Sequence, residues 1–400
     1  MTYLKSIFFF VLVFCSLTVK SQNYQDSLRR ELTDYLNKNS IPGLSVSILN
    51  KNKIVFEEGF GYANVAEKRA YTTETIQNIG SVSKTFIAVS LMKAIELGYF
   101  DLETDINAIL PFKVVNPYLP DEIIKVKYLT THTSGILDNL PIFNRSYRFE
   151  GPKVQNELLF KMMQENNYTS DLNDTTLVTF LKAYLTPQGA LYNKENFGNS
   201  SPSKRVSYRY SNIGSALAAY LIEVKSGMSF ADFTQRYIFK PLRMHKTSWF
   251  KTKENVKKQA IPYFTKNIAF PFYHLTTYPD GGLRTSDKEL SLYVREMMKM
   301  LEHNSNLITE RSAVEMFKPV FTLQSLPENM SLQTRNKGVF WNIYNDGYIG
   351  HDGDDPGASA NILFNKTTGI IFMSNIYIAD RTKILSILKK YAPLLVASSK

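Results

Sequence analysis

A serine and a lysine three residues apart, Ser81 and Lys84, are the first residues whose spacing suggests chemistry. They follow Gly80 at the start of a helical pattern that ends near Gly98, and residues i and i+3 share one helix face, about 5–6 Å apart. A desolvated lysine has a lowered pKa and can act as a base toward the serine, while the helix N-terminus favours developing negative charge. A helix cap with a surface lysine is the alternative interpretation.

The pattern Ser-x-x-Lys occurs five times in the chain, so the tetrapeptide alone is weak evidence. Ser90 and Ser386 lie within helical patterns, and Ser201 lies in a polar loop. The context therefore favours Ser81 as the nucleophile.

A second pattern, Tyr210-Ser211-Asn212, directly precedes an apolar helical run over residues 213–224. At a helix start a phenol can transfer a proton, and an amide can hold a substrate carbonyl. An asparagine cap beside a buried tyrosine is the alternative.

The third pattern, His351-Asp352-Gly353, is the chain's single His-x-Gly and is expected just before a strand over residues 358–364. A glycine at a strand edge lets a ligand approach the backbone closely. A histidine at a strand end is the alternative.

The elements that would position these residues are clearest near the two termini. Residues 26–37 form an amphipathic helical pattern, followed by a hairpin over 44–56. A second hairpin over 358–374 precedes a helical pattern over 381–395. We therefore expect an α/β (α+β) fold, in which an antiparallel sheet of terminal strands is flanked by helices and joined by a mainly helical lobe.

The expected boundaries are approximate. The terminal α/β lobe comprises about residues 25–65 and 335–396, and the helical lobe comprises about 66–334. Residues 138–207 are polar, aromatic and irregular, which indicates either a mobile insertion or a pocket wall.

Composition excludes several kinds of protein. The 400 residues carry a formal charge of +11 and 44% hydrophobic residues, which is ordinary globular composition. Cys15 is the single cysteine, so an intrachain disulfide framework or a cysteine-based zinc site is excluded. The five histidines form no local ligand pair, and we expect no metal and no nucleic-acid module.

The first 21 residues have the pattern of a signal peptide, with an unbroken apolar run over 7–14 that is short for a membrane span. A lipoprotein processed at Cys15 is less favoured, because bulky Phe14 precedes the cysteine. Cleavage would leave a single domain over 22–400 with no stable membrane span, in the periplasm or secreted. It would remove Lys5 and Lys20 and no acids, lowering the charge from +11 to +9. Such a basic surface could associate weakly with anionic envelope polymers.

The order Ser81, Tyr210, His351 resembles that of the serine β-lactamase and DD-peptidase superfamily, in its class C-like branch. Longer phrases resemble the family too, from about residue 27 to 395: IGSVSKTFIAVSLM (79–92), KYLTTHTSGI (127–136), YRYSNIGSALAAYLIEVKSGMSF (208–230), FKPLRMHKTSW (239–249), PDGGLRTSDKEL (279–290) and YIGHDGDDPGASA (348–360). The resemblance implies a β-lactamase/transpeptidase-like fold with the site between its two lobes.

The resemblance also implies roles. Ser81 would be acylated, Lys84 would help to deprotonate it, and Tyr210 would transfer a proton to the leaving group. Asn212, His351 and Gly353 would bind substrate, with His351 where many relatives carry the lysine of a Lys-Thr-Gly triplet. Backbone N–H groups of Ser81 and Asp354 would form the oxyanion hole, and no cofactor is implied.

The chain departs from the family at the third motif. Asp352 replaces a hydroxyl that helps β-lactam-directed relatives to bind a carboxylate, and Asp354 and Asp355 add negative charge. An anionic substrate would be repelled unless an arginine or lysine compensates. The acids could alternatively bind calcium, but calcium-loop spacing is absent. His132 is interpreted as structural, and Asp280 as a turn residue without chemistry.

These observations together predict an exported serine acyl hydrolase that cleaves an amide or ester through an acyl-enzyme on Ser81. A peptide, with D-residues as the favoured case, or a related small molecule is the expected substrate. A class C-like β-lactamase or an esterase is one alternative. A non-catalytic penicillin- or peptide-binding protein on the same fold is another.

Overall fold

A computed structural model describes residues 22–151, 154–168, 175–201, 203, 206–252 and 256–399. The predicted signal peptide, including Cys15, lies outside the described residues.

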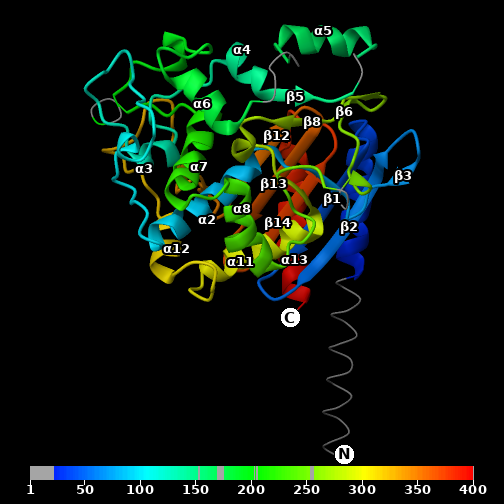
Figure 1. The fold of residues 1–400 in the computed structure, drawn as a ribbon. Coiled ribbons are helices and arrows are strands. Elements are labelled where there is room, and N and C mark those ends of the chain that lie inside the picture. The colour runs from blue at the N-terminus through cyan, green and yellow to red at the C-terminus, as the bar shows by residue number, and fades with distance from the viewer. Residues whose placement is uncertain are drawn as a thin grey trace, which may run out of the picture.

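Strands from both ends of the chain form one antiparallel sheet, as expected (Figure 1). The order is β10-β11-β12-β13-β14-β1-β2-β3, and the two ends of the chain meet where Leu44 of β1 lies opposite Ser374 of β14. The strands are β1 (Gly43–Leu49), β2 (Ile54–Asn64), β3 (Arg69–Ala70), β10 (Arg335–Lys337), β11 (Asn342–Tyr344), β12 (Ile349–Asp355), β13 (Ala358–Phe364) and β14 (Gly369–Ser374).

Both faces of this sheet are covered. The apolar residues of β1, such as Val46, pack toward a helix over residues 22–38 and toward α13 (Thr382–Ser398). The opposite face contacts α11 (Asp287–Met300), where the Ser47 hydroxyl donates to the Asp287 carboxylate. The alternating sequence of β1 therefore has a polar face that is buried against a helix rather than solvated.

The helical lobe is built around α2 (Ser83–Glu96) and α7 (Asn212–Ser226), which contact each other (Figure 1). Most residues of α2 are buried, so it is a central helix rather than an amphipathic surface one. The other helices of the lobe are η1 (Gly80–Val82), η2 (Ile106–Ala108), α3 (Val126–Thr130), α4 (Leu140–Phe143), η3 (Asn144–Ser146), α5 (Glu157–Glu165), α6 (Leu177–Leu185), η4 (Lys194–Asn196), α8 (Phe230–Thr234), η5 (Gln235–Phe239), α9 (Lys240–Leu242), η6 (Tyr278–Asp280) and α12 (Glu310–Phe317).

Short strand pairs complete the lobe: β4 (Ile76–Asn78) with β9 (Arg284–Ser286), β5 (Tyr147–Phe149) with β8 (Tyr273–Leu275), and β6 (Tyr263–Thr265) with β7 (Ile268–Ala269).

The stretch 138–207 contains more regular structure than its sequence indicates. It includes α4, β5, α5 and α6, and β5 pairs with β8 from a distant part of the chain. Its aromatic residues explain the difference, because Phe180 and Tyr184 are buried in the main core rather than displayed on a loop.

Candidate active site

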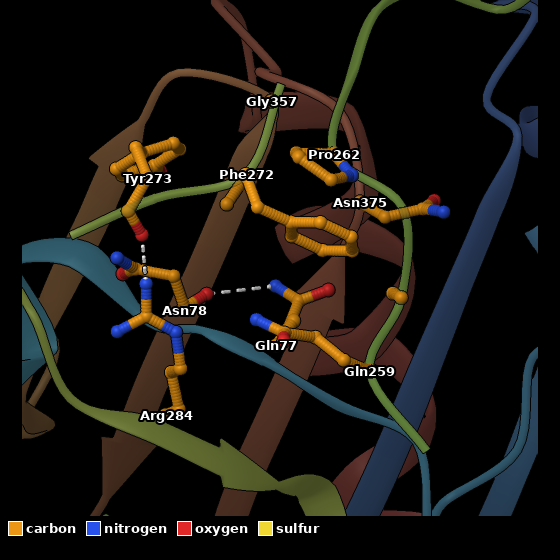
Figure 2. A pocket seen from close by; sticks show the side chains of 11 residues that line it. Gln77, Asn78, Gln259, Pro262, Phe272, Tyr273, Arg284, Gly357 and Asn375 are labelled. Atoms are coloured by element: carbon orange, nitrogen blue, oxygen red, sulfur yellow. Dashed lines mark hydrogen bonds between the residues drawn. The ribbon is translucent and has the colours of Figure 1, made fainter. Parts of the chain in front are cut away.

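Ser81 lies in a tight turn between β4 and α2, and this turn is held from behind by a polar scaffold. The Gln77 side-chain amide donates to the carbonyls of Asn78 and Ser374, and the Asn78 side chain accepts from the Gly80 N–H at 2.5 Å. Figure 2 shows Gln77 and Asn78 beside Arg284, whose guanidinium donates to the Tyr273 carbonyl. The hollow between them has about 20 Å³, so it holds one water at most and is not the substrate site.

Strand β12 lies directly against this turn. A Cβ on Gly353 would lie 2.0 Å from the Ile79 carbonyl oxygen and 2.9 Å from the Ser81 nitrogen. A Cβ on Gly80, whose φ is +51°, would lie 2.6 Å from the Asp354 nitrogen. Only glycines allow this approach, which brings the backbone of Asp354 beside that of Ser81, the two residues expected to form an oxyanion hole.

Lys84 is fully buried, and its ammonium is surrounded by acceptors. Its Nζ lies 3.1 Å from Ser81 Oγ, 2.6 Å from Asn212 Oδ1 and 2.5 Å from the carbonyl oxygen of Asp280. Burial lowers the pKa of Lys84, and nearby acids, first Asp280 and then Asp138, oppose that shift. Asp280 therefore contributes to the site, whereas the sequence suggested a turn without chemistry.

Asn212 is the first residue of α7, and the helix start is fixed by Asp138. The Asp138 carboxylate accepts from the N–H groups of Asn212 at 2.8 Å and Ile213 at 3.0 Å. Ser211 is the N-cap, with its hydroxyl accepting from the Gly214 N–H. A carboxylate at a helix N-terminus satisfies orphan donors and opposes the helix dipole, so it holds Asn212 toward Lys84.

Tyr210 lies over Lys84, with 5.0 Å between the Lys84 Nζ and the ring centroid. The residue as a whole is 37% exposed, but its phenol faces the site. Burial of the phenol raises the pKa of Tyr210 well above its usual range, and a hydrogen bond with Ser81 offsets part of that increase. The ring of His132 packs 4.4 Å from that of Tyr210, and His132 Nδ1 accepts from the Ser211 N–H. These contacts agree with a structural role for His132.

His351 lies within β12 and therefore before β13 (Ala358–Phe364), as the sequence predicted. His351 is 2% exposed, and its Nδ1 lies 2.6 Å from the backbone oxygen of Asp352. Because a carbonyl oxygen can only accept, this contact places the imidazole proton on Nδ1. Burial lowers the pKa of His351 to about 3, so the imidazole is neutral. Its ring centroid lies 6.4 Å from that of Tyr210, which brings the third motif to the first two.

Two of the acids of the third motif are compensated by an arginine, the alternative that the sequence left open. Arg381, directly before α13, donates to the Asp354 carboxylate, and its guanidinium lies 3.5 Å from the Asp352 carboxylate. Asp355 faces inward, accepts from the Tyr147 hydroxyl at 2.5 Å, and has a pKa raised by burial to about 7. An anionic substrate thus meets less negative charge than the sequence suggested.

Of the predicted site residues, Ser81, Tyr210 and His351 line a cleft of about 280 Å³, whereas Lys84, Asn212 and Gly353 lie outside its lining. Its lining residues are Ser81, Tyr208, Tyr210, Arg335, Asn342, His351, Asp352 and Asp354. Within the described part of the chain, no group of three or more histidine, cysteine, aspartate or glutamate residues could hold a metal ion.

Sequence reasoning missed the supports of this site: Asp138, Arg381, Arg335 and Asn342. Each comes from a segment without a recognisable motif, so no local spacing could have identified it.

Comparisons with known proteins identify the family and the fold. The Beta-lactamase family model matches residues 28–376. The protein named Protein flp from Staphylococcus aureus (strain N315) is 24% identical over 367 residues, which cover 90% of this chain and 64% of that protein, so the chain spans less than two thirds of its length.

Two solved structures share the fold. A structure of the octameric penicillin-binding protein homologue from Pyrococcus abyssi has a TM-score of 0.72 at 22% identity, covering 92% of this chain and 77% of that one. Beta-lactamase/D-alanine carboxypeptidase from Pseudomonas syringae has a TM-score of 0.67 at 17% identity, covering 92% and 98%. The family match extends over most of the chain, and the chain belongs to the beta-lactamase family.

Proposed function

We propose that the protein is a serine acyl hydrolase that forms an acyl-enzyme on Ser81. One observation carries the proposal: a fully buried lysine amine lies 3.1 Å from the Ser81 hydroxyl at the start of a helix. Burial disfavours the ammonium form of Lys84, which makes a neutral amine available as a base.

The proposed reaction has two halves. Ser81 Oγ attacks the substrate carbonyl and its proton passes to Lys84. Tyr210 delivers its own proton to the leaving nitrogen or oxygen as that bond breaks, and Lys84 then returns a proton to Tyr210. Water attacks the ester on Ser81, a proton of that water passes through the Lys84 amine to Ser81 Oγ, and the acid product leaves as the ester bond breaks. Backbone N–H groups of Ser81 and Asp354 would stabilise the oxyanion, a contribution typically worth about 10²–10³ in rate per donor.

We propose an amide or ester substrate, with a peptide that contains D-residues as the favoured class. The structural relative described as a beta-lactamase/D-alanine carboxypeptidase supports this choice at the level of the fold. Asn212, His351 and Gly353 would bind the substrate. Because Asp352 replaces a hydroxyl, we favour a peptidase over a β-lactamase, and an esterase is a further alternative.

A non-catalytic penicillin- or peptide-binding protein is the alternative of another class. It would use the same cleft without turnover. The buried Lys84 beside Ser81 favours the enzyme, because ligand binding alone does not require a desolvated base there.

We also propose export to the periplasm or the medium, from the residues 1–21 pattern, and weak association with anionic polymers, from the net charge of +9 that remains without those residues. Among the helices in the described ranges, none combines the length and hydropathy that crossing a bilayer requires. We propose no nucleic-acid partner.

The test is the intact mass of the protein after reaction with a fluorophosphonate probe, which bonds to a nucleophilic serine with loss of fluoride. We expect one adduct on the wild type and none on Ser81→Ala. Ser90→Ala is the matched control, because Ser90 starts another Ser-x-x-Lys copy on the same helix, and it should be labelled like the wild type. An adduct on Ser81→Ala would overturn the assignment. Turnover of D-peptides, esters and β-lactams by the unlabelled wild type, with Ser81→Ala as the inactive control, would rank the substrate classes.

A further inference from the structure

Lys337 is a second buried lysine near the site, and its surroundings differ from those of Lys84. Its side chain is fully buried at the end of β10. Among the residues that the structure describes, its Nζ has a single hydrogen-bond acceptor, Asn342 Oδ1 at 2.9 Å. The Lys337 Nζ also lies 5.8 Å from the centroid of the Tyr208 ring, in a cation–π contact. An ammonium has three donors, so this one is poorly satisfied for a group removed from water.

The charges around Lys337 do not favour a permanent ammonium. Burial lowers its pKa to about 7, repulsion from Arg335 and Lys84 adds to that shift, and attraction to Asp352 opposes it. In return, Lys337 helps to lower the pKa values of His132 and His351. The titratable and charged groups that face it are Lys84 of α2, His132 of the α3 end, Tyr208, Arg335 of β10, and His351 and Asp352 of β12.

Asn342 connects this lysine to the cleft. It lines the cleft, and in the sheet it lies opposite Gly350, the residue before His351. Since its Oδ1 accepts from Lys337, its Nδ2 faces the opposite way and donates to the Tyr344 hydroxyl at 3.3 Å. Lys337 thereby holds the Asn342 amide with Oδ1 toward the lysine and Nδ2 toward Tyr344.

We propose that Lys337 is a positioning residue for the acylation of Ser81, acting on the cleft through Asn342 and through its charge. The inference rests on the proposed function. The ammonium form orients Asn342 and favours the negative charge that develops on the substrate carbonyl, whereas the amine form supplies no charge. His132 and His351 are held neutral, and Asp355, whose pKa is also about 7, faces Tyr147 and does not line the cleft. Lys337 is therefore the basic group at the His351 end of the cleft whose charge changes near neutral pH.

The sign of the pH effect follows from this role. Deprotonation of Lys84 should favour acylation, whereas loss of the Lys337 proton near pH 7 should slow it. The wild-type profile should therefore contain a descending limb near pH 7 that belongs to Lys337, besides the ascending limb of Lys84. Removal of Lys337 should abolish the descending limb and leave the ascending one.

The experiment measures the rate constant for fluorophosphonate labelling of Ser81 between pH 5 and 9 in the wild type, Lys337→Met and the control Lys366→Met. Lys366 is exposed in the β13–β14 turn. We expect Lys337→Met to be slower at pH 6 by about tenfold, the order expected for one lost nearby charge, and to lack the descending limb. Lys366→Met should match the wild type. A purely structural role for Lys337 would lower the rate without removing a limb.

Asn342→Asp supplies a variant with the opposite effect. It keeps the shape of the side chain and places an anion beside Lys337, which should move the descending limb to higher pH. In parallel, NMR of ¹³C-labelled lysine, with the Lys337 signal assigned by its loss in Lys337→Met, should show a titration near pH 7. That measurement does not depend on activity.

The possible outcomes separate the two proposals. If Ser81 is labelled in all proteins with the same pH profile, or if Lys337 titrates above pH 10, the role of Lys337 is overturned and the proposed function stands. If the wild type is not labelled at any pH, the proposed function is overturned, and the role of Lys337 with it. Loss of the descending limb in Lys337→Met and its upward shift in Asn342→Asp support the inference.

Discussion

Two copies of the same pattern lie at helix α2, in very different surroundings. Ser81–Lys84 begins in η1, directly before the helix, and Ser90–Lys93 lies within the helix. Lys84 is fully buried and contacts Ser81, Asn212 and a backbone carbonyl. Lys93 instead pairs with Glu96 at 3.0 Å, with a quarter of its side chain exposed. Equal spacing thus places a lysine near a serine in either case, but only the copy that meets β12 and α7 has a desolvated amine.

The largest difference between the two copies is expected when each lysine is replaced in turn. Lys84→Met should lower the labelling rate of Ser81 by about 10²–10⁴, because the general base is lost. Lys93→Met should leave that rate unchanged and cost at most about 1 kcal/mol of unfolding free energy, as expected for a partly exposed ion pair. Labelling kinetics and chemical denaturation of both variants check these values. Equal losses in the two variants would show that Lys84 acts through stability rather than chemistry.

The next test concerns the strand that only the first copy meets. Gly353→Ala places a Cβ 2.0 Å from the Ile79 carbonyl oxygen, so β12 must move away from the Ser81 turn. We expect the labelling rate to fall by about 10²–10³, the usual effect of losing an oxyanion donor.

The matched control for that substitution is Gly98→Ala at the other end of α2. Gly98, unlike Gly353, has a positive φ, +74°, but a Cβ there meets no neighbour. This variant should lose about 1 kcal/mol of stability and keep the wild-type labelling rate. If Gly353→Ala is labelled as fast as Gly98→Ala, the close approach of β12 to the Ser81 turn is not required for the reaction of Ser81.

A smaller effect is expected from Asp280. Burial raises the pKa of this carboxyl well above its usual range, and its ionised form favours the ammonium form of Lys84. Asp280→Asn removes that charge but keeps the backbone carbonyl that accepts from Lys84. The pKa of Lys84 should then fall further, so the acidic limb of the labelling profile should move to lower pH. The pH dependence of the labelling rate measures this shift, with exposed Asp34→Asn as the control. A limb that moves to higher pH would contradict the assigned direction.

Much of the fold could be predicted from the sequence because its elements are encoded locally. The terminal hairpins and the closing helix have turn residues and apolar periodicity of their own, and β13 begins and ends at Ala358 and Phe364 as expected. Residues 138–207 were harder, since the pairing of β5 with β8 and the burial of Tyr184 depend on partners far along the chain.

The site divides in the same way. Ser81, Lys84 and Asn212 lie at helix starts, where short patterns carry information about position. Asp138 and Arg381 meet the site only after folding, and each is an ordinary polar residue in the sequence. The apparent excess of acids in the third motif was resolved by Arg381, which no spacing rule connects to β12.

The smallest effect is expected at Ser90, and it sharpens the comparison between the two serines. Ser90 is fully buried, and its Oγ has no hydrogen-bond partner among the described residues. An unsatisfied buried hydroxyl is unfavourable, so Ser90→Ala should leave the free energy of unfolding unchanged or raise it by up to about 1 kcal/mol, without changing Ser81 labelling. Denaturant midpoints of Ser90→Ala and Ser81→Ala measure the difference. A loss of stability in Ser90→Ala would show that the Ser90 hydroxyl bonds to its own helix. In either case the mid-helix serine is adapted to packing, while Ser81 is placed in a turn where its hydroxyl stays free to react.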